Sequence, residues 1–379
     1  MVEQNKISYL DYNSTTPVDP RVLEAMLPFL KDKFANPSST HHFGQSINEY
    51  VNQAREQIAD FINAESNELN FISGATEAIN IAIKGVAESY SNKGKHIITV
   101  STEHKAVLDT CKDLERKGFE VTYLPVQDNG LIELVELNKA IRPDTILVSV
   151  MCVNNETGVI QPIKEISKIA HKKGALFMTD ATQAVGKIEI DVDDLGIDLL
   201  CFSGHKIYAP KGIGALYLRQ RGNKVKLTSQ IHGGGHEQGI RSGTLNVPGI
   251  IALAKACEIS SQEMEHNKKN ISDLRDSLEV ELLKFPNTFL NGDSKKRIYN
   301  TSNICFQGHD ANVMIGRMKN IAISNGSACS SAVVEPSHVL KSMGLNDDDA
   351  FASLRFSLGK YNTHKDIEVV VNKIKELTQ

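Results

Sequence analysis

The sequence lacks any CxxC pair and any cysteine spacing typical of a metal site, although it contains six cysteines. Most of them lie in apolar runs, which predicts buried free thiols in a reducing compartment rather than a disulfide framework. We therefore expect no metal. The six residues are Cys111, Cys152, Cys201, Cys257, Cys305 and Cys329.

Long hydrophobic runs and a strong excess of charge are also missing. No run approaches the roughly 20 apolar residues of a membrane span, and the N-terminus has no apolar core suited to a signal peptide. We therefore expect a cytoplasmic protein without a membrane partner. The net charge is −4 and no cluster of lysine or arginine stands out, so we expect no direct nucleic-acid binding. The net charge still leaves room for a local basic patch.

What the sequence does contain is an alternation of apolar runs with amphipathic stretches between residues 73 and 218. The stretches 106–117, 131–141 and 163–173 have helical periodicity. Such alternation predicts an α/β fold, with a mainly parallel sheet, helices on both faces and ligands at the carboxyl ends of the strands. The apolar runs are residues 96–100, 121–126, 145–150, 175–179, 198–202 and 214–218.

With 379 residues the chain is too long for a typical single core, so two domains are expected. Residues 250–285 are typical of long charged helices that leave the α/β core. Strand-like runs such as 300–306 then alternate with helix-like stretches, which suits a smaller α+β domain. We place the large domain at residues 15–260 and the small domain at residues 1–14 together with 261–379.

Two polar residues at strand ends carry the strongest functional signal. Lys206 follows the buried run 198–202, and an unpaired ammonium there is costly. Burial lowers the pKa of such a lysine and makes it a nucleophile of the Schiff-base type, although an amine that reaches solvent is the alternative. Asp180 ends the preceding run, 175–179. A lysine and an acid at neighbouring strand ends are the pattern that holds pyridoxal phosphate, with the acid at the ring nitrogen.

A series of ordered motifs extends this signal over nearly the whole chain. With them the sequence resembles the fold-type I pyridoxal-phosphate enzymes and, among these, the cysteine desulfurases of the NifS/IscS group in the class V aminotransferase family. The resemblance implies a fold-type I transferase with pyridoxal 5'-phosphate as cofactor and L-cysteine as substrate. The motifs are residues 9–17 (YLDYNSTTP), 36–39 (NPSS), 73–77 (SGATE), 103–104 (EH), 154–158 (NNETG), 180–183 (DATQ), 203–206 (SGHK), 241–244 (RSGT) and 327–329 (SAC).

The phosphate of the cofactor is expected at a small-residue turn that opens a helix. Ala75 and Thr76 lie in this turn, where free N–H groups and the helix dipole attract an anion. An ordinary helix cap by Ser73 or Thr76 is the alternative. Ser203 and His205, beside the lysine, add further donors.

Thr244 is the further phosphate ligand that the resemblance implies. In similar enzymes the matching threonine reaches the phosphate from the neighbouring subunit. The resemblance therefore implies that the protein is a homodimer.

Four more residues are candidates for cofactor or substrate contacts. His104 follows a strand and can stack on the ring and exchange protons, and a lone surface histidine is the alternative. Gln183 can donate to the phenolic oxygen of the ring. Asn155 can bind the substrate carboxylate or a cofactor oxygen, unless it is a simple turn residue. Arg355, flanked by apolar residues, matches an α-carboxylate, with a structural salt bridge as the alternative.

Cys329 distinguishes a desulfurase from other enzymes of this fold. It lies in a segment of small and polar residues, about 324–334, which predicts a loop. A thiolate there can attack the sulfur of a cofactor-bound cysteine and take it as a persulfide, leaving alanine. The residues that follow continue the pattern of the long-loop (group I) desulfurases.

The rival functions are a pyridoxal-phosphate aminotransferase or lyase, and a non-catalytic sulfur-transfer scaffold. The resemblance also implies a sulfur-acceptor protein, with iron–sulfur clusters, tRNA thiolation or DNA phosphorothioate modification as the products. The chain stops soon after a helix-like stretch, residues 365–377. Housekeeping members of the group have a further C-terminal extension that docks the iron–sulfur scaffold, so we expect a specialised sulfur donor.

Overall fold

The structure is a computed structural model that describes residues 7–222, 224–326 and 335–378. Cys329 therefore lies outside the described residues. Within these ranges no helix combines the length and the apolar character that crossing a membrane would require.

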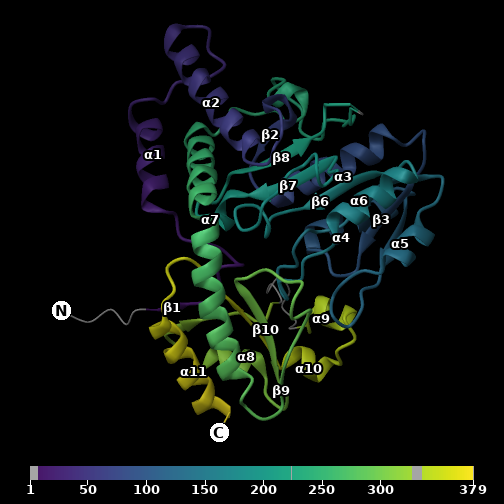
Figure 1. The fold of residues 1–379 in the computed structure, drawn as a ribbon. Helices are drawn as coiled ribbons and strands as arrows, with labels where there is room; N and C mark the ends of the chain where they lie inside the picture. Colours follow the sequence, from purple (N-terminus) through teal and green to yellow (C-terminus); the bar gives the residue numbers. More distant parts are fainter. Residues whose placement is uncertain (1–6, 223, 327–334, 379) are drawn as a thin grey trace.

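A seven-stranded sheet forms the centre of the larger part of the molecule (Figure 1). Strand β8 is antiparallel to both of its neighbours, and the other neighbouring pairs are parallel. This confirms the predicted α/β fold with a mainly parallel sheet. In spatial order the strands are β2 (Leu69–Ile72), β8 (Gly214–Leu218), β7 (Leu199–Ser203), β6 (Leu176–Asp180), β5 (Thr145–Ser149), β3 (His96–Val100) and β4 (Glu120–Leu124).

Helices cover both faces of this sheet because successive strand residues point to opposite sides. Ile97 packs in the core under α3 and α4, and Ile98 packs in the core on the other face. Strands buried on both faces explain why the sequence shows continuous apolar runs. One face is covered by α3 (Ala75–Ser89) and α4 (Lys105–Glu115), and the other by α1 (Pro20–Lys31), α2 (His42–Asp60), α5 (Leu134–Ala140), α6 (Ile163–Lys172) and the first half of α7 (Val247–Leu282).

A second, smaller core contains two small sheets. One is antiparallel and three-stranded, and in the other β1 and β11 are paired in parallel. The strands are β12 (Ser353–Ser357), β10 (Thr301–Phe306), β9 (Thr288–Leu290), β1 (Ser8–Tyr9) and β11 (Ile321–Ala322), and the helices in this part are α8 (Ala311–Gly316), α9 (His338–Ser342), α10 (Asp347–Phe351) and α11 (His364–Thr378).

One helix, α7, connects the two cores (Figure 1). The sequence suggested several long helices here, but the structure has a single one of 36 residues. Ile250 and Leu253 pack in the large core, and Leu274 and Leu278 pack in the small one. The predicted domain division near residue 260 falls inside this continuous helix and stays a prediction.

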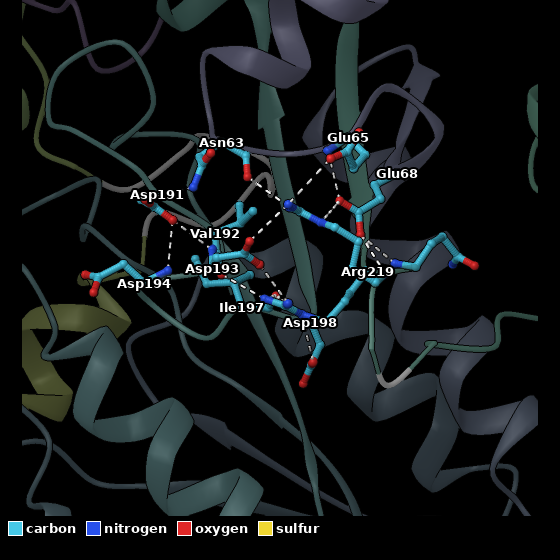
Figure 2. A network of polar contacts seen from close by, with 12 residues as sticks. Asn63, Glu65, Glu68, Asp191, Val192, Asp193, Asp194, Ile197, Asp198 and Arg219 are labelled. Atoms are coloured by element: carbon cyan, nitrogen blue, oxygen red, sulfur yellow. Dashed lines mark hydrogen bonds and ion pairs between the residues drawn. The ribbon is translucent and has the colours of Figure 1, made fainter.

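A polar network fixes the amino end of β7, opposite to the end that leads to Lys206 (Figure 2). Arg219, just after β8, binds Asp193 at 2.8 Å and the backbone oxygen of Ile197. Arg221 pairs with the buried Glu68 at 3.0 Å. Glu68 ends the 3-10 helix η1 (Ser66–Glu68), and the other two such helices are η2 (Gly204–Lys206) and η3 (Glu237–Gly239).

Candidate active site

A cavity of about 540 Å³ opens at the carboxyl ends of β6 and β7. Most of the predicted site residues line it. Thr244 is exposed and does not line it, and Cys329 lies outside the described residues. The predicted residues in the lining are Ala75, Thr76, His104, Asn155, Asp180, Gln183, Ser203, His205, Lys206 and Arg355.

Lys206 is held over the cavity by the short helix η2, which directly follows β7. Its amine donates to the backbone oxygens of Asn13 at 2.6 Å and Ser14 at 2.5 Å. The pKa of Lys206 is lowered to about 8, mainly by burial and in smaller part by the charge of the nearby Arg355 guanidinium. A far larger fraction of this amine is neutral near pH 7 than in an exposed lysine, and the neutral amine is the nucleophile.

The carboxylate of Asp180 lies at the end of β6 and is 6% exposed. One of its oxygens accepts the backbone N–H of Thr182 at 2.9 Å. The hydroxyl oxygen of Thr182 is buried and has no partner among the described residues, and this side chain also lines the cavity. The end of β6 therefore offers a carboxylate and an unused hydroxyl to a polar ligand.

Helix α3 presents an uncapped amino end to the cavity. Neither Ser73 nor Thr76 caps the helix, because the N-cap residue is Gly74 and no side chain caps it. The backbone N–H groups of the first turn are free to bind an anion. A Cβ atom on Gly74 would lie 3.4 Å from the Ser203 hydroxyl, so Ser203 faces this turn.

Glu77, the acid in the first turn of α3, repels a bound anion less than a free carboxylate would, because its charge is paired. Glu77 pairs with Arg241 at 2.7 Å and accepts the backbone N–H of Ser73 at 2.8 Å. The segment that contains Thr244 is thereby attached close to the amino end of α3. The pKa of His205, which also lines the cavity, is lowered to about 4, mainly by burial and in smaller part by the charge of Lys206.

His104 is the N-cap residue of α4, and its Nδ1 accepts the backbone N–H of Ala106 at 3.1 Å. The neutral ring therefore has its proton on Nε2. Burial lowers the pKa of His104, against the opposing charge of Asp180. The imidazole is thus predominantly neutral at physiological pH, with a proton on the nitrogen that is not needed for capping.

Arg355 lies on β12 and is 4% exposed. One Nη pairs with Asp11 at 2.6 Å, the other donates to the backbone oxygen of Asn155 at 2.9 Å, and Nε has no partner among the described residues. The salt bridge considered from the sequence is therefore present, and part of the guanidinium is still unused. Asn155 also lines the cavity.

Sequence reasoning missed three residues around the cavity. Asn13 and Ser14 hold Lys206 through their backbone oxygens, which leave no signal in the side chains. Lys187 donates to the side-chain oxygen of Gln183 at 2.7 Å and is 8% exposed. A lysine within the largely apolar stretch 184–190 is a signal that the sequence offered.

Comparison with known proteins identifies the family. The profile of the family described as "Aminotransferase class-V" matches residues 8–370. "Cysteine desulfurase IscS" of Pectobacterium carotovorum subsp. carotovorum (strain PC1) is 50% identical over 371 residues, which are 97% of this chain and 92% of that protein. The chain belongs to the class V aminotransferase family. It is a cysteine desulfurase that uses pyridoxal phosphate.

Solved structures agree with this assignment. A structure titled "NIFS-LIKE PROTEIN" has a TM-score of 0.92 and 38% identity, and the match covers 98% of this chain and 99% of that one. The structure titled "SspA in complex with cysteine" has a TM-score of 0.83 and 41% identity, and covers 94% and 99%. The fold is thus that of the fold-type I pyridoxal-phosphate enzymes, as the sequence predicted.

The residues of the cavity fit pyridoxal phosphate. Lys206 offers an amine of lowered pKa to the aldehyde, and Asp180 offers a carboxylate to the ring nitrogen. The uncapped amino end of α3 matches the phosphate in charge and in hydrogen-bonding need. The unpaired hydroxyl of Thr182 supplies one more polar contact.

Proposed function

We propose that this cysteine desulfurase is a homodimer that converts L-cysteine to L-alanine and keeps the sulfur as a persulfide on Cys329. The observation that carries the proposal is the cavity where Lys206, Asp180 and Arg355 meet. These residues come from β12 and from the ends of β6 and β7. Together they combine a nucleophilic amine, an acid for the ring nitrogen and a cation for a carboxylate.

In the proposed site each residue has one task toward the cofactor. Lys206 would hold the cofactor through its aldehyde group, and Asp180 would keep the ring nitrogen protonated. Ala75 and Thr76, through the first turn of α3, hold the phosphate together with Ser203 and His205, and Gln183 donates to the phenolic oxygen. When bound, pyridoxal phosphate supplies an electron sink that weakens bonds at the substrate.

The substrate carboxylate is assigned to Arg355 and Asn155. The unpaired Nε of Arg355 and the amide of Asn155, which lines the cavity, both offer donors to it. Asp11 limits the net positive charge that the guanidinium presents. His104 is proposed to exchange a proton through Nε2, because its Nδ1 accepts the Ala106 N–H.

The sulfur step is assigned to Cys329, on the strength of the sequence. Its thiolate attacks the sulfur of the substrate, so that a new S–S bond forms while the bond between Cβ and sulfur breaks. The electron pair of the broken bond stays on carbon, and protonation there gives the methyl group of alanine. The persulfide then transfers its outer sulfur to an acceptor thiol.

A second subunit is proposed to complete the phosphate site. Thr244 is exposed and does not line the cavity of its own chain. Large apolar side chains are exposed near the N-terminal helices, among them Leu30 at 57% and Phe34 at 71%. Exposed apolar groups of this size are typical of a surface that another subunit covers.

The acceptor is proposed to be a separate protein. The net charge of −4 gives no general attraction to nucleic acid, so thiolated tRNA or phosphorothioate DNA would be reached through that protein. Iron–sulfur cluster assembly is a third outlet for the same persulfide. Titration with duplex DNA at physiological salt tests the direct route, and submicromolar binding would refute the charge argument.

A cytoplasmic location is proposed on the basis of the thiols. The five described cysteines are free and buried. Free thiols of this kind persist in reducing compartments. The acceptor protein would then be a cytoplasmic partner as well.

The proposed function is tested by replacing Cys329. The Cys329→Ser variant is expected to bind the cofactor and L-cysteine, as seen in the visible spectrum, but to form no protein persulfide from ³⁵S-labelled cysteine. The control is Cys257→Ala, which removes a buried thiol of α7 and should leave the persulfide yield unchanged. Alanine production by Cys329→Ser at the wild-type rate would refute the persulfide assignment.

A further inference from the structure

Lys187 is a buried cation that the proposed chemistry does not use. The residue is 8% exposed, and its amine bonds to the neutral Gln183 side chain and pairs with no carboxylate among the described residues. The pKa of Lys187 is lowered to about 7, mainly by burial and in smaller part by the charges of Lys206 and Arg355. A buried lysine without an acidic partner lowers the stability of the fold, so its presence here calls for a role that offsets this cost.

The only hydrogen bond of the Lys187 side chain within the described residues goes to the side-chain oxygen of Gln183, at 2.7 Å. On the other side, the Gln183 amide nitrogen donates to the backbone oxygen of Asn13 at 2.8 Å. A backbone carbonyl only accepts, so the amide nitrogen of Gln183 must face Asn13 and the amide oxygen must face Lys187. Chemistry alone therefore fixes which end of the amide faces which partner, whichever way the two atoms are assigned.

The orientation leaves one amide hydrogen for the cavity. Gln183 has two N–H groups on its side chain, and Asn13 accepts one of them. Gln183 is 4% exposed and lines the cavity, so the other N–H has a polar ligand as its natural partner. The carbonyl of Asn13 also accepts from Lys206 at 2.6 Å, which links the two lysines through Gln183 and Asn13.

We propose that Lys187 is a positioning residue for the cofactor pocket: its amine holds the side-chain oxygen of Gln183, so that the amide N–H faces the phenolic oxygen of bound pyridoxal phosphate. The inference rests on the proposed cofactor contact of Gln183. Gly186, beside Lys187, packs closely against Ile207, the residue after Lys206, because a Cβ on Gly186 would lie 2.6 Å from the Ile207 side chain. Hydrogen bonds in a chain polarise one another, so Lys187 also strengthens the donor that faces the cofactor.

The test compares Lys187→Met, Lys187→Gln and Gln183→Met with the double variant Lys187→Met/Gln183→Met, all loaded with cofactor. The readouts are the pH midpoint of the visible cofactor band and the affinity for added pyridoxal phosphate. Lys187→Met is expected to weaken cofactor binding about tenfold, the equivalent of one charged hydrogen bond, and to move the midpoint. Lys187→Gln keeps a donor and should lie between Lys187→Met and the wild type.

The double variant decides the inference. If Lys187 acts through Gln183, the double variant should match Gln183→Met alone, whereas independent roles would give additive losses. The control is Lys168→Met, which changes an exposed lysine on α6. Additive losses, or a Lys187→Met spectrum and affinity equal to those of the control, would overturn the role of Lys187 and leave the contact of Gln183 standing. A Gln183→Met variant with unchanged spectrum and affinity would overturn both.

Discussion

At the scale of single residues, Lys187 shows how a side chain can serve the site at the expense of the fold. It is buried, its pKa is lowered to about 7, and its partner is a neutral amide rather than an acid. A methionine of similar length would fill the same space without desolvating a charge. The fold alone does not account for the lysine, but a need to orient Gln183 does.

The cost of Lys187 predicts a specific pH dependence of stability. Its pKa of about 7 in the folded chain lies below the value of 10.5 expected in the unfolded chain. Between these values the unfolded chain binds the extra proton, so the free energy of unfolding rises with pH across this window. Below pH 7 the full penalty, up to ~5 kcal/mol, is present. Without cofactor, Lys187→Met should therefore be more stable than the wild type at pH 7, and the gap should narrow by pH 10.

Urea unfolding of both cofactor-free proteins at several pH values measures this difference. Only the difference between wild type and variant is informative, because the two proteins share all their other titratable groups. A parallel pH dependence of the two proteins would show that Lys187 has an ordinary pKa in the folded state. The lost hydrogen bond to Gln183 costs about 1 kcal/mol and reduces the gain without reversing it.

At the scale of elements, the network of Figure 2 connects three chain segments at the amino end of β7. The carboxylate of Glu68 is fully buried and accepts the backbone N–H groups of Gln220 at 2.7 Å and Arg221 at 3.0 Å. It also accepts from the Arg221 side chain and from the Glu65 backbone. A buried carboxylate with this many donors holds η1 against the chain that leaves β8.

Glu68→Gln should lower the free energy of unfolding by about 2–4 kcal/mol, because the new amide group would face donors with a donor. The matched control is Glu65→Gln. Glu65 contacts the same arginine at 3.8 Å, but its side chain is 63% exposed, so the change should be about 0.5 kcal/mol or less. The comparison is made by urea unfolding of the cofactor-free proteins. Equal losses in the two variants would mean that burial of Glu68 does not matter.

The sequence predicted the elements better than their contacts. The ends of β6 and β7, and with them Asp180 and Lys206, followed from apolar runs that stop at polar residues. Helix α5 is shorter than the helical stretch 131–141 expected from the sequence, and only Leu134–Ala140 is helical. The pairing of Arg355 with Asp11 joins residues 344 positions apart, and no local pattern carries that information. The motifs named most of the residues that line the cavity, and only the fold showed what they contact.

At the scale of the whole molecule, the exposed surface indicates where the proposed second subunit would bind. Phe34 and Phe43 lie edge to face at 5.5 Å between ring centroids, yet are 71% and 39% exposed. The segment before Thr244 is attached to α2, since Glu237 pairs with Arg55 at 2.7 Å. An isolated chain thus exposes both an apolar surface and a threonine without a ligand, and a homodimer would explain both.

Mixing two inactive variants tests whether Thr244 acts across the dimer. Lys206→Ala removes the amine, and Thr244→Glu places a negative charge where the phosphate is expected. If Thr244 serves the partner's site, a mixed dimer contains one doubly damaged site and one site with both native residues. Random exchange of subunits in equal amounts should then restore about a quarter of the wild-type activity. If Thr244 serves its own site, every site in the mixture has one defect and no activity returns, although sedimentation would still show whether the protein is a dimer.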